Sequence, residues 1–301
     1  ARLTLRAGAE HLAVGYYEEC ARRFPNTAHS LEAKFRLADF YFDKEAFEQA
    51  QPLYLEAMNE QPNAPRTKEA LKQWILCLYK TKNFARAEIE AKKFEELNKN
   101  ERASIAELQY AAGESAVAAK DFVSAERIFR KLGKDYRDTP SGILGDYGLG
   151  KALLIQTKTE EALETLTDIP KRYPKHPFLH TVYLGLGDFY QAQQQWDNAL
   201  TAFAQVAKDS LYDNNYRLAV RSLLDVYDRM GLKDRALALA RHYVARFPED
   251  AKALDLKLKV GLLLIDLAQF DDAVAHFKRL KPSVDATVEP EVQYYIGKSH
   301  M

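Results

Sequence analysis

Apolar residues recur along the whole chain with the period of an α-helix. Ala38, Tyr41 and Phe42 are spaced by three and four residues, and the segment from Ala199 to Val206 repeats this spacing. Side chains at such positions share one face of a helix. The pattern therefore predicts an all-α chain built from amphipathic helices.

A second, much longer period is superimposed on the helical one. Alanines recur every 37 or 38 residues, at Ala13, Ala50, Ala87, Ala125, Ala162, Ala199, Ala236 and Ala273. Twelve residues before seven of these alanines stands a residue that is most often glycine: Ala38, Ile75, Gly113, Gly150, Gly187, Leu224 and Gly261. Four residues after the alanines a large apolar residue recurs, at Tyr17, Tyr54, Phe129, Leu166, Phe203 and Phe277, with Ala91 and Ala240 as exceptions.

The offset of twelve residues stays constant while the length of the repeat drifts by one residue. This difference predicts two helices joined by a fixed turn within each unit and a variable link between units. Small residues such as Gly187 and Ala199 are what a close approach of two helix axes requires. Each unit is therefore expected to be a helical hairpin.

One unit shows the consensus residues together, at Tyr183, Leu186, Gly187, Tyr190, Ala199 and Phe203. These residues resemble the tetratricopeptide repeat pattern, with Tyr in place of its Trp and a period of about 37 rather than 34 residues. The resemblance covers nearly the whole chain and implies a right-handed superhelical solenoid of about eight repeats that binds other proteins. The expected units are residues 1–30 in part, 31–67, 68–105, 106–142, 143–179, 180–216, 217–253, 254–289 and 290–301 in part.

Several units end in an aromatic residue followed by proline, at Phe24-Pro25, Tyr173-Pro174 and Phe247-Pro248. This ending is similar to that of bacterial cell-envelope repeat proteins such as the Tol-Pal regulator and outer-membrane-assembly lipoproteins. The resemblance favours a periplasmic or envelope-associated location over a cytoplasmic one. The first and last hairpins are incomplete, near Leu3–Leu5 and after Gln293, so we expect a fragment of a longer protein whose uncapped ends can self-associate.

Composition narrows the class of partner. The sequence has 43 Lys and Arg against 43 Asp and Glu, so it lacks the positive charge of a protein that neutralises many phosphates. Nucleic acid is therefore not an expected partner. The apolar run Val260–Ile265 is far shorter than the roughly 20 residues of a membrane span.

Three sequence features superficially suggest chemistry. His176 and His180 have a spacing compatible with metal binding, but Pro177 lies between them and no further ligand completes a site. The glycines of residues 145–150 fall inside an expected helix rather than after a strand, which argues against a phosphate loop. Cys20 and Cys77 occupy apolar helical positions and are expected to be buried free thiols. No catalytic constellation stands out, so we expect no enzyme activity, no metal and no cofactor.

In the tetratricopeptide family the first helices of successive repeats line a concave groove that receives the partner. The resemblance places three rows of residues on this face, at positions i, i+4 and i+7 of each first helix. The expected partner-binding residues are Tyr79, Tyr110, Glu114, Val117, Tyr147, Lys151, Leu154, Leu184, Asp188, Arg221 and Asp225. Aromatic anchors framed by a few charges are typical of binding hot spots.

The leading prediction is a non-enzymatic scaffold for a protein or peptide partner, possibly in a bacterial envelope complex. Two alternatives remain open: a spacer that positions a domain of a larger enzyme or exporter, and a solenoid whose tyrosines stack on glycans. Modules that grip chaperone C-termini carry Asn in the row occupied here by Asp39, Leu76, Glu114, Lys151, Asp188 and Asp225. That mode is not expected, because none of these residues is Asn.

Overall fold

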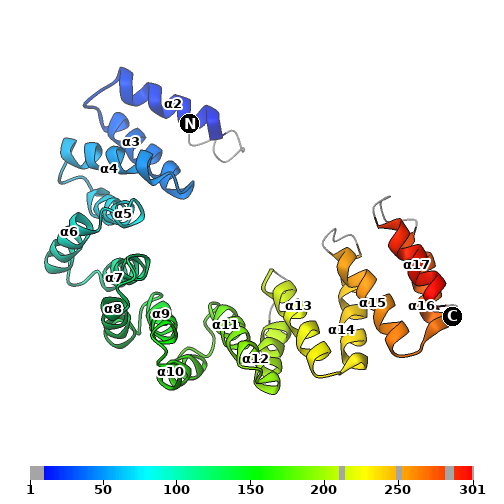
Figure 1. Ribbon diagram of the computed structural model, residues 1–301. Coiled ribbons are helices and arrows are strands. Elements are labelled where there is room, and N and C mark those ends of the chain that lie inside the picture. The colour runs from blue at the N-terminus through cyan, green and yellow to red at the C-terminus, as the bar shows by residue number, and fades with distance from the viewer. Residues whose placement is uncertain (1–9, 210–213, 249–252, 282–287, 300–301) are drawn as a thin grey trace. The chain divides into compact units, whose positions relative to one another are not determined.

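The computed structural model describes residues 10–209, 214–248, 253–281 and 288–299 (Figure 1). The described residues form only helices and turns, as predicted. The helices are α2 (Glu10–Arg23), α3 (Ala28–Asp43), α4 (Phe47–Glu60), α5 (Thr67–Lys80), α6 (Phe84–Leu97), α7 (Arg102–Ala118), α8 (Phe122–Asp135), α9 (Gly142–Ile155), α10 (Thr159–Arg172), α11 (Leu179–Ala192), α12 (Trp196–Asp209), α13 (Asn214–Arg229), α14 (Lys233–Arg246), α15 (Leu254–Asp266), α16 (Phe270–Leu280) and α17 (Glu289–Ser299).

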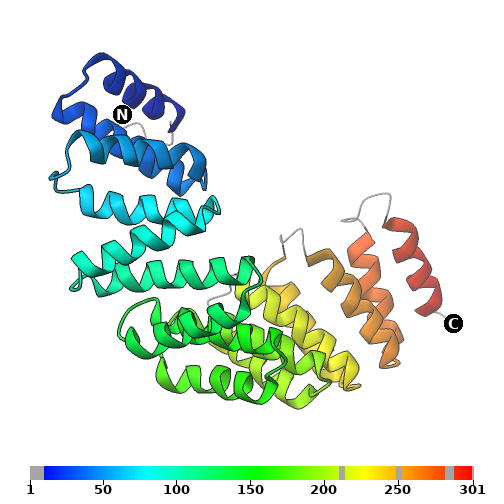
Figure 2. The same ribbon diagram turned by 60° about the vertical axis from the view of Figure 1, so that its left-hand side comes forward.

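The chain divides into two compact units, residues 1–169 (unit 1) and 170–301 (unit 2). Within each unit, helices pack in chain order as hairpins, for example α3 on α4 and α15 on α16. First helices of neighbouring hairpins also touch, as α5 and α7 do in unit 1. The hairpins of unit 1 lie one on the next with their helices side by side (Figure 2). This is the architecture of an α-solenoid. Leu3–Leu5, where the sequence suggests the end of a first helix, lies outside the described residues.

The turn inside each hairpin explains the constant offset of twelve residues. In the first such turn the amide of Ala46 donates to the carbonyl of Tyr41 at 2.8 Å, and the amide of Glu45 donates to the carbonyl of Phe42 at 2.9 Å. These two bonds define a Schellman motif, in which one residue takes a left-handed conformation. The corresponding residues have φ between 55° and 69° in seven hairpins: Glu45, Lys82, Lys120, Thr157, Gln194, Gly231 and Ala268.

Complementary side-chain sizes fit the two helices of a hairpin together. A Cβ built on Gly113 would lie 2.3 Å from the Phe129 ring, and one on Gly187 would lie 2.3 Å from the Phe203 ring. Gly261 with Phe277 and Gly150 with Leu166 are equally close, at 2.2 and 2.5 Å. The prediction that small residues allow the helix axes to approach is confirmed.

The size relation is reversed in the two hairpins that depart from the ladders. Ile75 stands at the glycine position and Ala91 at the aromatic position sixteen residues later. Leu224 and Ala240 form the second reversed pair, and Ile75, Leu224 and Ala240 are all buried. A large residue on one helix is thus matched by a small one on its partner, whichever helix carries it.

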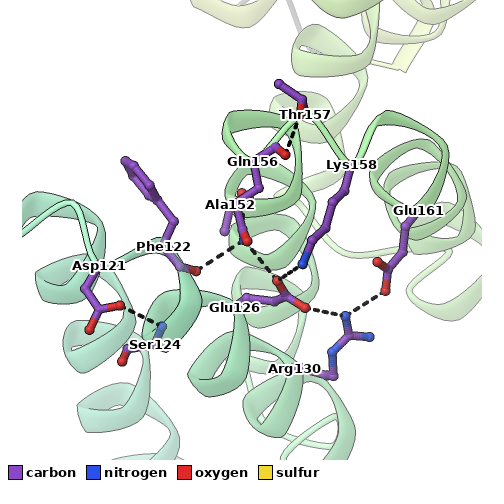
Figure 3. Close-up of polar contacts among 10 residues, drawn as sticks. All are labelled: Asp121, Phe122, Ser124, Glu126, Arg130, Ala152, Gln156, Thr157, Lys158 and Glu161. Atoms are coloured by element: carbon purple, nitrogen blue, oxygen red, sulfur yellow. Dashed lines mark hydrogen bonds and ion pairs between the residues drawn. The ribbon is translucent and has the colours of Figure 1, made fainter.

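A polar cluster joins the last two hairpins of unit 1 (Figure 3). The carboxylate of Glu126 in α8 accepts hydrogen bonds from Lys158 at 2.7 Å, Gln156 at 2.9 Å and Arg130 at 3.0 Å. Arg130 also donates to Glu161 of α10 at 2.7 Å. These contacts lower the pKa of Glu126 to about 2, with Lys158 as the largest cause. The second helix of one hairpin is therefore tied to the turn of the next.

Candidate functional site

A groove of about 640 Å³ opens in unit 1 across three successive hairpins. It is lined by the C-terminal ends of α3 and α5, by α7 and by the first residues of α4 and α6. Five aromatic side chains contribute to it: Phe42, Phe47, Tyr79, Phe84 and Tyr110. We call this feature the aromatic groove.

Helical spacing brings the groove residues onto one face of each first helix. Leu76 and Tyr79 are three residues apart in α5, and Glu107, Tyr110 and Glu114 follow one another at i, i+3 and i+7 in α7. Tyr79 is only 5% exposed, so most of its ring packs in the core and an edge reaches the groove. Tyr110 is half-buried, with its ring centroid 6.0 Å from that of Phe129.

The charges around the aromatic groove are unevenly paired. Glu107 lies 2.8 Å from Lys72, whereas Asp43, Glu45 and Glu114 are exposed and form no ion pair within the described part of the chain. Two exposed lysines, Lys80 and Lys82, also line the groove. With Glu107 neutralised by Lys72, three carboxylates face the two ammonium groups of Lys80 and Lys82, and the lining carries a net negative charge.

The hydroxyl of Tyr110 is held in its neutral form. Burial is the largest cause, and the nearby Glu114 and Tyr147 add to it, so that the pKa of Tyr110 rises to about 12. A neutral phenol has a proton to donate. Tyr110 therefore offers the groove an apolar ring together with a hydrogen-bond donor, a combination that is frequent at protein interfaces.

The structure brings three of the predicted site residues, Tyr79, Tyr110 and Glu114, into the aromatic groove. The other four from unit 1 do not line it. Val117 and Leu154 are half-buried against the core, and the Lys151 ammonium lies 5.7 Å from the centroid of the Tyr147 ring. Their role in partner binding stays a prediction.

Phe47 and Phe84 are groove residues that the sequence pattern of the first helices did not predict. Each begins the second helix of its hairpin, and aromatic residues recur at this register at Phe122, Trp196 and Phe270. The signal is present in the sequence as a further ladder. Because this ladder lies on second helices, the family resemblance gave no reason to place it at the groove.

Unit 2 holds the remaining predicted residues. Asp188 is an exposed residue that lines a cavity of about 580 Å³ together with Gln191, Trp196 and Arg229, and partial desolvation of its carboxyl raises its pKa. Asp225 accepts a hydrogen bond from Gln191 of α11. The last two are Leu184, which is half-buried, and Arg221, which lies 3.9 Å from Asp255.

The features that superficially suggest chemistry have structural roles. Residues 145–150 lie inside α9, where a Cβ on Gly145 would lie 2.7 Å from Leu132. His176 accepts a hydrogen bond from the Phe178 amide through Nδ1 at 3.2 Å. Cys77 is buried as predicted, but Cys20 is half-buried because it borders a cavity with Tyr16 and Tyr17, so that part of the prediction was wrong.

Neither a metal-binding cluster nor a membrane-spanning helix occurs in the described part of the chain. No group of three or more His, Cys, Asp or Glu side chains within the described ranges could hold a metal ion. None of the described helices is long and apolar enough to cross a bilayer.

Comparison with known families identifies the repeat. The model of the tetratricopeptide repeat matches residues 146–176 and 181–210, the segments that contain Gly150 and Gly187. The chain contains tetratricopeptide repeats. Such repeats generally mediate protein–protein interactions and are typically non-catalytic.

Two solved structures match this chain at low sequence identity. A protein known from the functional characterization of Pseudomonas aeruginosa pilF is 16% identical, with a TM-score of 0.50 over 76% of this chain and 97% of its own. A tetratricopeptide repeat protein from Parabacteroides merdae ATCC 43184 is 15% identical, with a TM-score of 0.47 over 91% of this chain and 100% of its own. No curated protein matches the sequence significantly.

Proposed function

We propose that this tetratricopeptide-repeat chain is a non-enzymatic scaffold that binds a segment of a partner protein in the aromatic groove of unit 1. The observation that supports this proposal is the convergence of five aromatic side chains from three hairpins on one opening. Buried aromatic anchors inside a polar frame contribute most of the free energy at many protein interfaces. The volume of the groove, about 640 Å³, is large enough for side chains of a helix or an extended segment.

The charges indicate the chemistry of the partner segment. The unpaired carboxylates of Asp43, Glu45 and Glu114 favour a segment that carries Lys or Arg beside its apolar anchors. Lys80 and Lys82, which also line the groove, would be compatible with one acidic residue in the segment. The proposed ligand is therefore a short apolar segment with a net positive charge. Charge complementarity of this kind sets specificity and the association rate more than affinity.

A displayed library of random peptides tests the proposal and does not require the partner to be identified first. Wild-type protein is expected to select peptides with apolar anchors and basic residues. The Phe84→Ala variant is expected to lose this selection, because removing one anchor of a hot spot typically costs at least tenfold in affinity. Phe122→Ala is the matched control, since Phe122 begins α8 at the same register but does not line the groove.

The charge preference has its own test. Glu114→Lys is expected to shift the selected peptides toward acidic residues, because Glu114 is exposed and forms no ion pair with any residue that the structure describes. The proposal is wrong if Phe84→Ala and Phe122→Ala select the same peptides as the wild type. Selection of glycans from a carbohydrate array, abolished by Tyr110→Ala, would instead favour the glycan-binding alternative.

We also propose a periplasmic or envelope-associated location, on the aromatic-proline endings of three repeats at Pro25, Pro174 and Pro248. Fractionation of the source cells tests it. Recovery of the protein with cytoplasmic markers would contradict the proposal.

A further inference from the structure

A second pocket, of about 340 Å³, lies in unit 2 away from the predicted first-helix face. Arg241 lines it from α14, and His276 and Arg279 line it from α16. Val260 and Leu264 of α15 supply an apolar side. We call it the α14–α16 pocket. We propose that this pocket binds a carboxylate of an acidic segment of a partner protein, with Arg241 and Arg279 as its ligands.

Unit 1 has a pocket at the equivalent place in its repeats. That pocket, of about 480 Å³, is lined by Lys92 of α6 and Lys131 of α8. Lys92 and Arg241 both stand five residues after the ladder alanine of their helix, and Lys131 and Arg279 both stand six residues after theirs. The repeat thus places two cations at the same register in both units.

The two pockets differ in what neutralises these cations. In unit 1 the carboxylate of Glu95, eight residues after Ala87, accepts hydrogen bonds from Lys131 at 3.4 Å, from Gln109 at 3.2 Å and from Tyr136 at 3.3 Å. In unit 2 the residue at this register is Val244, and the neighbouring Glu96 is replaced by Ala245. The α14–α16 pocket therefore keeps the cations and lacks a carboxylate at the register of Glu95, although Asp272 of α16 also lines it.

The arginines of the α14–α16 pocket have little compensation from the chain itself. Arg279 forms no ion pair within the described residues. Arg241 lies 4.0 Å from Asp272, and their side chains are 50% and 67% exposed, a geometry that contributes little free energy in water. Two guanidinium groups against the single carboxylate of Asp272 in the lining leave a net positive charge.

His276 does not add to this charge at neutral pH. Its Nε2 lies 2.7 Å from the carbonyl oxygen of Lys257, which fixes Nε2 as a donor. Burial is the largest cause of its lowered pKa, and Arg241 and Arg279 lower it further. Binding is therefore expected to depend on the arginines and to persist above pH 7.

A protein carboxylate fits this environment better than a hydrated anion. Planar guanidinium groups bind carboxylates through paired hydrogen bonds. The apolar side chains of Val244, Val260 and Leu264 offer a surface for the methylene groups of a glutamate, whose carboxylate would then take the place that Glu95 holds in unit 1. The segment expected here is acidic, whereas the aromatic groove is expected to prefer a basic one.

Fluorescence anisotropy with a labelled hexaglutamate peptide and the full chain tests the proposal. The wild type is expected to bind it at low ionic strength and to bind hexaglutamine much more weakly. Arg279→Gln and Arg241→Gln are each expected to weaken binding about tenfold, as the loss of a charge-assisted hydrogen bond predicts. Arg235→Gln, at an exposed residue of α14 that does not line the pocket, is the matched control and is expected to bind like the wild type.

A second pair of variants tests the comparison between the units. Val244→Glu supplies the carboxylate from within and is expected to weaken peptide binding about tenfold, whereas the uncharged Val244→Gln is expected to weaken it far less. Equal binding by Val244→Glu and Val244→Gln would overturn the proposal. Equal losses of peptide affinity in Arg279→Gln and Arg235→Gln would also overturn it, since such losses would reflect only the overall charge of the chain.

The source of the anion is distinguished by competition at constant ionic strength. Displacement of the peptide by glutarate is expected. Displacement by inorganic phosphate but not by glutarate would overturn the assignment to a carboxylate. This test is independent of the proposed function of the aromatic groove. Phe84 lines that groove and not the α14–α16 pocket, so Phe84→Ala is expected to leave hexaglutamate binding unchanged.

Discussion

The contact between Gly113 and Phe129 predicts that one substitution has opposite effects at two helical glycines of unit 1. Gly113→Ala places a Cβ 2.3 Å from the Phe129 ring, where carbon atoms prefer a separation of about 3.5 Å or more. The ring or the helix must then move by about 1.2 Å. A Cβ on Gly15, in α2, meets nothing within 4 Å.

The Phe129 ring has no free space into which to move. It is fully buried, and a Cβ on Gly148 of the next hairpin would lie 2.8 Å from the same ring. Overpacking of a close-packed core typically costs about 1–3 kcal/mol, while replacing glycine by alanine inside a helix gains about 1 kcal/mol. Gly113→Ala is therefore expected to lower the free energy of unfolding by up to about 2 kcal/mol. Gly15→Ala is expected to raise it by about 1 kcal/mol.

Urea denaturation followed by circular dichroism measures both variants against the wild type. Because the clash is with one ring, Phe129→Leu in the Gly113→Ala background is expected to cost about 1 kcal/mol less than Phe129→Leu alone. If Gly113→Ala stabilises the protein as much as Gly15→Ala does, the size-matching account of the hairpins is refuted.

Two further predictions concern charge and backbone. Glu126→Gln is expected to destabilise the protein by about 1 kcal/mol at pH 7, because it removes a carboxylate that Lys158 and Arg130 contact. Because the pKa of Glu126 is lowered, its contribution to the free energy of unfolding is complete above about pH 4.5 and is lost as the pH falls toward about 2. The difference in unfolding free energy between the wild type and Glu126→Gln, measured in denaturation experiments, is therefore expected to shrink over that window. An undiminished difference at pH 2 would contradict the assignment. Lys120 and Gly231 have left-handed φ values of 61° and 69°, respectively. Lys120→Gly is therefore expected to stabilise the protein by about 0.5–1 kcal/mol, and Gly231→Ala to destabilise it by a similar amount. If both substitutions change the melting temperature in the same direction, the turn conformation does not decide the effect.

The hairpin was predictable because its signals are local and repeated. Small residues equivalent to Gly113 and Ala125 recur in most repeats, always twelve residues apart. Two closely packed helices joined by a turn of constant length require both the small residues and the fixed offset. The conformation of the turn was not predictable in detail. Glycine is the usual sign of a left-handed residue, yet only Gly231 among the seven is glycine, and Lys82 or Ala268 carries no such sign.

The aromatic groove was predictable only in part. Tyr79 and Tyr110 followed from the resemblance to a repeat family, whose first helices face a groove. Phe47 and Phe84 reach the same opening because the turns direct the start of α4 and α6 toward it, which depends on three-dimensional geometry. The significance of Val244, which stands at the register of Glu95, could not be predicted from the sequence, because it depends on the contact between Glu95 and Lys131.

The matched pairs of large and small residues have a consequence for how such an array changes over generations. Gly187 with Phe203 and the reversed pair Ile75 with Ala91 are each sixteen residues apart, inside one hairpin. A duplication or deletion of a whole hairpin carries both members along and preserves the fit. Recombination between the two helices would join Ile75 to a second helix of the Phe203 type, or leave a void between two small residues. Exchange at the links between hairpins is therefore expected to preserve the fit, and exchange at their tight turns is expected to disrupt it.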